Sequence, residues 1–316
     1  MRKRILGKTG LEVTELGFGA WTIGGVSYGD VDKKDAVDTI NSYINAGGNF
    51  IDTARRYDAS ESILGNYFKE YRNRENIVLC SKTFAGQQME TVPIIREDVE
   101  ASLKLMGTSY IDVYYLHQPP EDDGVIDAAL TELEKAKEEG LIRHIGASIK
   151  GPNVNQMTVD LCRKYIKTGR VDVFQVVYSI LRQKLYDVIL EAQDAGIGIV
   201  ARTALESGFL SGNYSPGHVF TEPDHRARWI EANLEFILEK TRDIGKLVNA
   251  PYENIPQIAT KFTLTNPGIS TLILGARNSD QVIRNMKTEI LPPLPEETLN
   301  VLKQTYGYIT ERCNTK

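Results

Sequence analysis

The chain has 316 residues, of which 41% are hydrophobic and 25% are charged, and its formal net charge is −5. This composition is typical of a globular protein with ample material for a large core. The sequence contains no block of basic residues and no run of the roughly 18 apolar residues that a membrane helix needs, so neither nucleic acid nor a membrane is favoured as a partner.

The cysteines and the first residues bear on the cellular compartment. Cys80, Cys162 and Cys313 are odd in number and far apart, without the spacing of a disulfide framework or a metal site. The opening sequence MRKRILGKTG is basic but is not followed by the apolar stretch of a secretory signal. We therefore expect a cytoplasmic protein, with Cys80 as a small core residue.

Short runs of β-branched and apolar residues recur along the chain. They are preceded by residues 1–13, where two short apolar runs around GKTG predict a β-hairpin. Most of the later runs are continuously apolar, which is typical of parallel strands buried on both faces. They occupy residues 14–20, 48–54, 76–82, 111–117, 142–148, 173–179, 196–202 and 270–276.

The segments between these runs favour helices, and several of them end in glycine, as the carboxyl ends of helices prefer. They include residues 32–47, 94–107, 127–140 and 186–196. Eight strands that alternate with helices predict one α/β domain over residues 1–316, a (β/α)8 TIM barrel. An open doubly wound sheet is the alternative, but no G-x-G-x-x-G follows the first run, which counts against a dinucleotide-binding sheet of that kind.

Two later segments depart from the simple repeat. Residues 203–269, between the seventh and eighth runs, begin with a stretch rich in glycine, proline and aromatic residues, and so long a loop is usually functional. The tail after Leu291 starts with prolines and ends as a predicted helix.

Polar side chains gather where three consecutive runs end, at the rim where such barrels carry their active sites. Asp52 and Tyr57 follow the second run, Lys82 the third and His117 the fourth. Taken singly, Asp52 suits a helix cap, His117 a loop and Tyr57 the surface. Lys82, however, closes an apolar strand and must either reach water or pair with a buried acid. Asp52 is available as that acid, so together the four residues favour a functional site.

The four side chains suit the donation of a proton to an oxygen that is becoming an alkoxide. The ordinary pKa of tyrosine is near 10, and a neighbouring ammonium stabilises the phenolate and makes Tyr57 a usable acid. Asp52 would hold Lys82 charged, and a neutral His117 would hydrogen-bond the substrate oxygen. No nucleophile and no metal-ligand spacing accompany them, so a nicotinamide hydride is the natural source of electrons.

The stretch GNFIDTARRYDASESILG, residues 48–65, resembles the aldo-keto reductase signature G-x-N-x-I-D-T-A-x-x-Y-G-x-S-E-x-x-L-G. Further matching stretches occur in the expected order: ILGKTGLEVTELGFGAW, SKT, YIDVYYLHQP, AKEEGLIRHIGAS, GIGIVARTALESGFLSGNY and STLILGARNSDQV. The resemblance implies a metal-free barrel that reduces aldehydes and ketones with NADPH, or with NADH in some members. It also implies a catalytic tetrad of Asp52, Tyr57, Lys82 and His117, with Tyr57 as the general acid.

The resemblance extends to residues that would hold the nicotinamide and the pyrophosphate. Gln175 and Ser148 match positions that bind the carboxamide, but Ile149 stands where the family usually has asparagine, which removes one amide contact. Arg202 stands where many members stack an aromatic ring on the nicotinamide, and a guanidinium plane can lie there in the same way. The pyrophosphate would lie along the backbone of Thr203, Leu205, Gly208 and Leu210.

The segment GARNSDQVIRN resembles the family's adenosine-phosphate segment. Gly275 and Arg277 would face the 2′-phosphate, and Gln281 and Asn285 the adenine. Arg277 favours NADPH, because arginine suits a phosphate dianion. The alternative is an ordinary helix start, with Ser279 as its cap.

The walls of the substrate pocket are less defined, because they come from variable loops. Trp21, Tyr28 and Phe84 are the candidates for an aromatic mouth, although core packing is the commoner fate of such side chains. Asp58 replaces the glycine of the signature and tolerates an unusual backbone. Arg55 and Arg56 occupy its free positions, so we expect them to face solvent or neighbouring loops.

The predicted function is reduction of a small carbonyl compound, with sugar or polyol oxidation as the reverse use of the same residues. The alternative from a different class is a cofactor-binding regulatory subunit of a potassium channel, as in some relatives with this barrel. The chain has no basic or hydrophobic docking extension, which argues against that alternative.

Overall fold

The computed structural model describes residues 1–25, 27, 31–149, 151, 153–222, 224–229 and 231–306. Its centre is a closed barrel of eight parallel strands in the order β10-β3-β4-β5-β6-β7-β8-β9. These strands are β3 Leu16–Gly19, β4 Phe50–Asp52, β5 Val78–Thr83, β6 Ile111–His117, β7 Ile142–Ser148, β8 Val173–Val177, β9 Gly198–Arg202 and β10 Ile269–Gly275. Each lies within or next to a predicted run, so the (β/α)8 barrel is confirmed and the open sheet is wrong.

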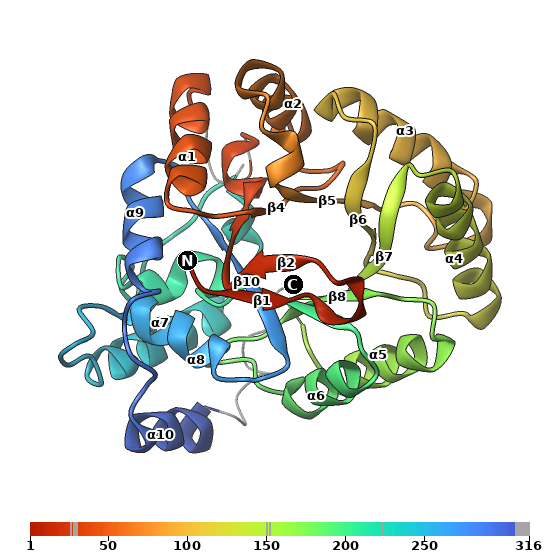
Figure 1. Ribbon diagram of the computed structural model, residues 1–316. Helices are drawn as coiled ribbons and strands as arrows, with labels where there is room; N and C mark the ends of the chain where they lie inside the picture. Colours follow the sequence, from red (N-terminus) through yellow and green to blue (C-terminus); the bar gives the residue numbers. More distant parts are fainter. Residues whose placement is uncertain are drawn as a thin grey trace.

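Helices surround the barrel on its outside (Figure 1). They are α1 Lys33–Asn45, α2 Ser60–Tyr71, α3 Ile94–Met106, α4 Asp123–Glu138, α5 Gln156–Thr168, α6 Tyr186–Asp194, α7 Glu231–Gly245, α8 Ile255–Leu264, α9 Ser279–Lys287 and α10 Glu296–Tyr306. None of the helices in the described ranges combines the length and apolarity that crossing a membrane requires.

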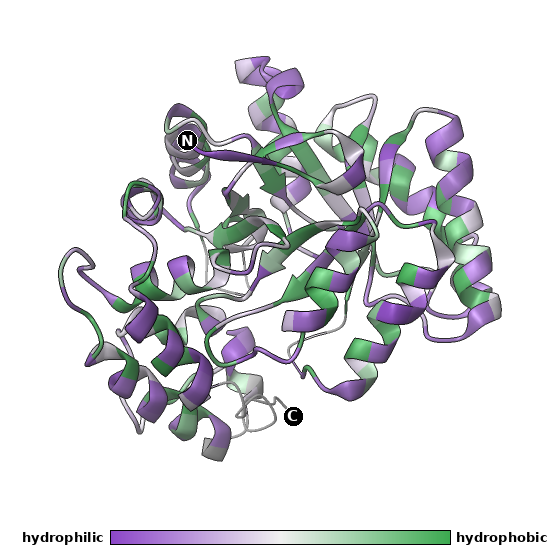
Figure 2. Cartoon of the chain, turned by 60° about the horizontal axis from the view of Figure 1, so that its bottom comes forward, coloured by the Kyte–Doolittle hydropathy of each residue, from purple (hydrophilic) through white to green (hydrophobic). Residues whose placement is uncertain are grey.

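The apolar strands are buried on both faces, as their continuous hydrophobicity predicts. The barrel interior holds a small cluster that includes Phe50, Cys80, Tyr115 and Val200. A larger cluster lies between the strands and the helices. Figure 2 shows the same arrangement, with hydrophobic strands at the centre and helices whose outer faces are hydrophilic.

Side-chain caps set the starts of several helices, and the observed starts correct two alternatives from the sequence. The side chain of Asn278 accepts a hydrogen bond from the backbone N–H of Gln281, so Asn278 and not Ser279 caps α9. Asp52 does not cap α2 either, because that helix begins at Ser60, after Ala59.

The predicted hairpin is present as strands β1 Lys3–Ile5 and β2 Glu12–Thr14. It crosses one end of the barrel (Figure 1), and Leu6 and Val13 close the interior cluster from that side. The backbone N–H of Lys8 donates to the carbonyl of Gly196 at 2.6 Å, just before β9 begins. The hairpin therefore covers the amino ends of the strands and leaves their carboxyl ends to the loops.

The long segment after β9 contains two short 3-10 helices, η6 Glu206–Ser211 and η7 His225–Arg228, followed by α7 and α8. After β10 come α9 and the predicted C-terminal helix, α10. The extra material, described over residues 203–222 and 224–229, thus follows the carboxyl end of a barrel strand, where it can contribute to a site.

Candidate active site

Lys82 and Asp52 form an ion pair inside the barrel rim. The ammonium nitrogen of Lys82, on β5, lies 2.6 Å from Oδ2 of Asp52, the last residue of β4, and both side chains are buried. Lys82 also donates to the carbonyl of Thr53 at 2.8 Å. Burial alone would lower the pKa of Lys82, but the Asp52 carboxylate, together with Tyr57 and Cys80, outweighs burial and raises that pKa. Lys82 is therefore a charged ammonium at neutral pH.

The other oxygen of Asp52 has a partner that the sequence did not suggest. The Gln175 side chain, on β8, donates from Nε2 to Oδ1 of Asp52 at 2.7 Å. The Ser148 hydroxyl, at the end of β7, donates to Oε1 of Gln175 at 3.2 Å. These two residues thus lie together, as their predicted shared role requires, and they also join the Asp52–Lys82 pair.

Tyr57 lies just beyond β4 with its hydroxyl 3.5 Å from the Lys82 ammonium. The same ammonium is 4.8 Å from the centre of the tyrosine ring. A tight contact positions this loop, because a Cβ atom on Gly24 would stand only 2.2 Å from the Tyr57 carbonyl oxygen. The next residue, Asp58, has a φ of 46°, the left-handed conformation that explains why the family signature has glycine there.

His117, the last residue of β6, completes the group. Its ring lies edge-on to Tyr57, with the centroids 6.0 Å apart. Burial, together with the positive charges of Lys82, Arg202 and Arg56, holds the pKa of His117 well below its usual range. Its Nδ1 atom is buried and has no hydrogen-bond partner among the described residues. His117 is therefore neutral at physiological pH, as expected.

Aromatic side chains pack against Tyr57 and His117. Trp21 stacks on Tyr57 with 5.4 Å between ring centroids, and Phe84 lies 4.0 Å from His117. His225, from η7, lies 4.7 Å from Trp21, a contact that no motif or spacing in the sequence indicated. Tyr28 lies outside the described residues.

The two arginines of the signature stretch differ in their surroundings. Arg55 is held by Glu61 at 2.7 Å and by Asp98 at 3.4 Å, so it braces the Tyr57 loop against α2 and α3. Arg56 is exposed, with its guanidinium carbon 4.3 Å from the centre of the Phe84 ring. The expectation that both face solvent or loops is therefore wrong for Arg55.

The residues predicted to hold the cofactor lie along the same rim. Arg202 ends β9 and donates to the carbonyl of Ile149 at 3.1 Å, while the Ile149 side chain is buried in the core. The loop that follows has positive φ at Thr203, Glu206, Ser207 and Gly208. Leu205 is half-buried and Leu210 is buried. The backbone N–H groups of Gly208 and Leu210 already donate to the Leu205 carbonyl, at 2.8 and 3.1 Å, and so are occupied within the loop.

The predicted adenosine-phosphate segment joins the end of β10 to α9. The Gln281 side chain accepts from the backbone N–H of Arg277 at 2.8 Å, and Asn285 donates to the Gly275 carbonyl at 3.4 Å. The Arg277 side chain is exposed. Across the part of the chain that the structure describes, no three His, Cys, Asp or Glu side chains are grouped to hold a metal ion.

Residues 15–306, almost the whole chain, match the model of the aldo/keto reductase family. The chain belongs to this family. A curated relative, an NADH-specific methylglyoxal reductase of Escherichia coli (strain K12), is 29% identical and aligns with 90% of this chain and 93% of its own. A probable voltage-gated potassium channel subunit beta of Oryza sativa subsp. japonica is 25% identical, with 96% of each chain covered.

A solved structure supports the same assignment. An aldo-keto reductase from Bacillus halodurans, in its holo form, is 25% identical and superposes with a TM-score of 0.77 over 100% of this chain and 98% of its own. As a member of the aldo/keto reductase family, the chain is an NAD(P)H-dependent oxidoreductase.

Proposed function

We propose that this reductase transfers hydride from NADPH to the carbonyl carbon of a small aldehyde or ketone, with Tyr57 as the general acid. The observation that carries the proposal is the buried Lys82–Asp52 pair at 2.6 Å with the Tyr57 hydroxyl 3.5 Å from the ammonium. A charged ammonium beside a phenol stabilises the phenolate that remains once the proton has been given away. Asp52, Tyr57, Lys82 and His117 would thus act as one unit.

The donor set around this unit fits a nicotinamide dinucleotide. Ser148 and Gln175 offer a hydroxyl and an amide for a carboxamide, Arg202 offers a guanidinium plane for the nicotinamide ring, and Arg277 offers a cation for the 2′-phosphate. When bound, the cofactor supplies the hydride. Ile149 has no side-chain amide, so Gln175 and Ser148 would hold the carboxamide without a third side-chain partner.

The chain's own residues would handle the oxygen of the substrate. Tyr57 donates its proton to that oxygen, and Lys82 stabilises the resulting phenolate. A neutral His117 donates a hydrogen bond to the same oxygen without competing as an acid. Trp21 and Phe84 pack on Tyr57 and His117 and would exclude water from the reacting centre.

A first prediction concerns Tyr57→Phe, which removes the proton donor and keeps the ring stacked on Trp21. We expect kcat for carbonyl reduction to fall roughly 10²- to 10⁴-fold, the usual contribution of general acid catalysis. The measurement follows NADPH absorbance with a panel of aldehydes, ketones and sugars, and calorimetry of NADPH binding serves as the control. Full activity of Tyr57→Phe would show that the general acid lies elsewhere.

A second prediction concerns the choice of NADPH over NADH, which rests on Arg277. Arg277→Ala removes a cation from the segment proposed to meet the 2′-phosphate. We expect KM for NADPH to rise roughly 10- to 100-fold, since a hydrogen bond to a charged group is worth about 1.5–3 kcal/mol. KM for NADH, which lacks that phosphate, should change little. Equal effects on the two cofactors would remove the argument for NADPH.

A second candidate function is a cofactor-binding channel subunit with little turnover, favoured by the likeness to a probable potassium channel subunit beta. The same panel separates the two functions: tight NADPH binding without reduction or oxidation of any compound supports the subunit. If a sugar or polyol is the physiological reductant, NADP⁺ reduction by that compound should be faster than NADPH oxidation by any carbonyl compound of the panel.

We also propose a cytoplasmic location, because Cys80 and Cys162 are buried free thiols.

A further inference from the structure

A fully buried ion pair lies under the loop that follows β9, outside the tetrad. The Nε atom of Arg182 is 2.8 Å from Oε2 of Glu206, and both side chains have 0% exposure. The Ser179 hydroxyl donates to the other carboxylate oxygen of Glu206. The Arg182 guanidinium also lies 5.4 Å from the centre of the Trp229 ring. We call Ser179, Arg182 and Glu206 the buried cluster.

Stability alone is a poor reason for such a cluster. Removing two charges from water is costly, and a buried ion pair is often no more stabilising than well-packed apolar residues of the same volume. A buried pair of this kind can instead fix the conformation of the chain that carries it. Glu206 sits in the loop after β9, whereas Ser179 and Arg182 follow β8 and bridge each other through backbone hydrogen bonds.

The backbone at Glu206 is unusual. Glu206 and Ser207 have φ values of 48° and 56°, and Gly208 follows with 94°. Left-handed conformations are unfavourable for residues other than glycine, and they persist where the surroundings enforce them. The Glu206 side chain is anchored at both oxygens, so the buried cluster supplies that constraint.

The same loop has a backbone pattern that suits an anion. Leu205 has φ −98° and ψ 16°, near the right-handed region, and is followed by the left-handed Glu206. Alternation of this kind can turn backbone N–H groups toward one concavity, as in phosphate-binding loops. The N–H groups of Glu206, Gly208 and Leu210 already donate to carbonyls of Thr203 and Leu205, so a diphosphate here would meet N–H groups of other residues in the loop. The Arg182 charge also offsets the Glu206 carboxylate, which would otherwise repel phosphate from beneath the loop.

We propose that Ser179, Arg182 and Glu206 are positioning residues that hold residues 203–212 in the conformation that receives the cofactor diphosphate. The inference rests on the proposed function, because it assumes that the cofactor lies along this loop. The cluster touches the cofactor through the loop backbone only, so it governs cofactor affinity and leaves the Tyr57 proton transfer unchanged.

The experiment replaces the ion pair by apolar residues of similar size, in the double variant Arg182→Met/Glu206→Leu. Calorimetry measures Kd for NADPH, steady-state kinetics measure kcat at saturating NADPH, and thermal unfolding measures Tm. We expect Kd to rise roughly 10- to 100-fold, by analogy with the loss of groups that orient the ligands of a metal ion. Both kcat and KM for the carbonyl substrate should stay within about twofold, since transition-state contacts are kept.

A matched control comes from an exposed pair of the same residue types. Arg163 and Glu191 contact each other at 2.7 Å between α5 and α6, and Arg163→Met/Glu191→Leu should leave Kd unchanged. Ser179→Ala removes one hydroxyl from the cluster and should raise Kd less than the double variant does. It remains informative if the double variant does not fold.

The outcomes separate the two proposals. A wild-type Kd in the folded double variant overturns the positioning role, even if Tm falls, because a purely structural pair would act on Tm alone. If the double variant does not fold, a wild-type Kd in Ser179→Ala overturns it instead. A wild-type protein that does not bind NADPH contradicts the proposed function instead, and this is measured first.

Discussion

Asp52 engages both of its carboxylate oxygens, one with Lys82 and one with Gln175. The Gln175 amide has two N–H groups and two lone pairs, and Asp52 and Ser148 occupy one of each. In the proposed function, the second N–H and the second lone pair would serve the nicotinamide carboxamide. At the scale of the residue, Gln175 therefore belongs to the proposed cofactor site and also contacts Asp52, which pairs with the Lys82 ammonium beside Tyr57. A substitution at Gln175 should thus affect both cofactor binding and proton donation.

A third prediction, also at this scale, concerns pH and His117. Its folded-state pKa is lowered by burial and nearby cations, whereas an unfolded histidine has a pKa of about 6.5. The unfolded state therefore binds the proton first, and stability is lost as pH falls below about 6.5, by at most about 1.4 kcal/mol per pH unit. His117→Gln should remove this part of the acid sensitivity.

Denaturant unfolding measures the free energy of unfolding at several pH values between about 7.5 and 5.5, and the slope of that free energy against pH is compared between variants. His218 is exposed, so His218→Gln is the control and should keep the wild-type slope. An unchanged slope in His117→Gln would mean that this histidine takes up its proton as readily in the folded protein as in the unfolded chain.

At the scale of the element, the loop between β4 and α2 is held from outside the barrel. Arg55 contacts Glu61 on α2 and Asp98 on α3, and the Ser81 hydroxyl, from β5, donates to Glu61 at 2.6 Å. These ties join β5 and two helices to the loop that carries Tyr57. The contacts of Arg55 with α2 and α3 thus help to fix the position of the Tyr57 side chain.

A fourth prediction tests this bracing with neighbouring arginines. Arg55→Ala leaves the buried Glu61 carboxylate without its cation, and we expect a loss of about 2 kcal/mol in the free energy of unfolding. This is below the roughly 3–5 kcal/mol of a fully buried pair, since Arg55 is partly exposed. Arg56→Ala removes only an exposed stacking contact and should cost about 0.5–1 kcal/mol. Equal losses in denaturant unfolding would argue against the bracing role.

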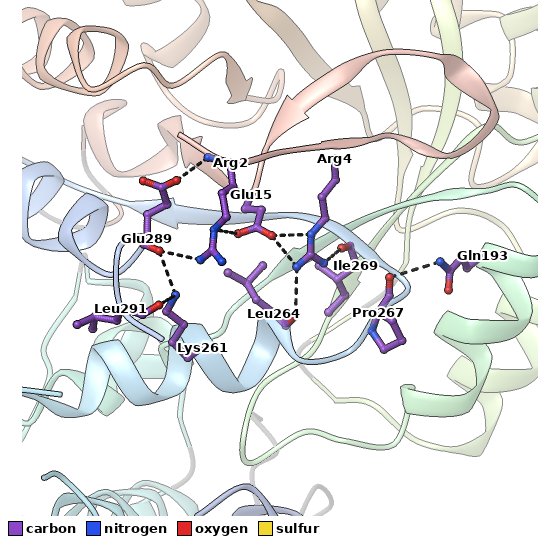
Figure 3. A network of polar contacts seen from close by, with 10 residues as sticks. All are labelled: Arg2, Arg4, Glu15, Gln193, Lys261, Leu264, Pro267, Ile269, Glu289 and Leu291. Atoms are coloured by element: carbon purple, nitrogen blue, oxygen red, sulfur yellow. Dashed lines mark hydrogen bonds and ion pairs between the residues drawn. The ribbon is translucent and has the colours of Figure 1, made fainter. Parts of the chain in front are cut away.

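At the scale of the whole molecule, the two ends of the barrel have different roles. The proposed chemistry lies at the carboxyl ends of the strands, while the hairpin covers the amino ends. Figure 3 shows how that hairpin is tied down: Arg4 contacts Glu15 at 2.7 Å and donates to the Ile269 carbonyl at 2.6 Å. Lys261 of α8 donates to the Leu291 carbonyl at 2.6 Å, which joins the chain after α9 to the same face.

A fifth prediction follows from this separation. Arg4→Ala removes the donor of the Ile269 carbonyl and leaves Glu15 with the more exposed Arg2, so we expect a loss of about 1–3 kcal/mol in unfolding free energy. The value of kcat/KM, measured well below the unfolding temperature, should stay at the wild-type level. Lys3→Ala, which breaks an exposed pair with Glu12, is the control and should change neither quantity. A parallel loss of activity in Arg4→Ala would show that the two ends are coupled.

Much of this architecture could be predicted from local patterns. Continuous apolar runs and helical periodicity located the eight barrel strands and the hairpin, because burial on both faces leaves its mark on every residue of a strand. The rule that parallel strands end at one rim then brought Asp52, Tyr57, Lys82 and His117 together, and the distances agree. The sequence predictions were wrong where several partners were available to a group, as for the Arg55 side chain and for the residue that caps α9.

The sequence by itself therefore determined the barrel, its rim and the residue types gathered there, since each depends on hydrophobic periodicity and chain order. Only the tertiary structure decided which side chains meet across the barrel. Gln175 on β8 reaches Asp52 on β4, four strands away around the barrel. Glu206, in the loop after β9, contacts Arg182, in the segment after β8. The physical reason is that closing the sheet brings into hydrogen-bonding distance residues whose separation along the chain carries no periodic signal.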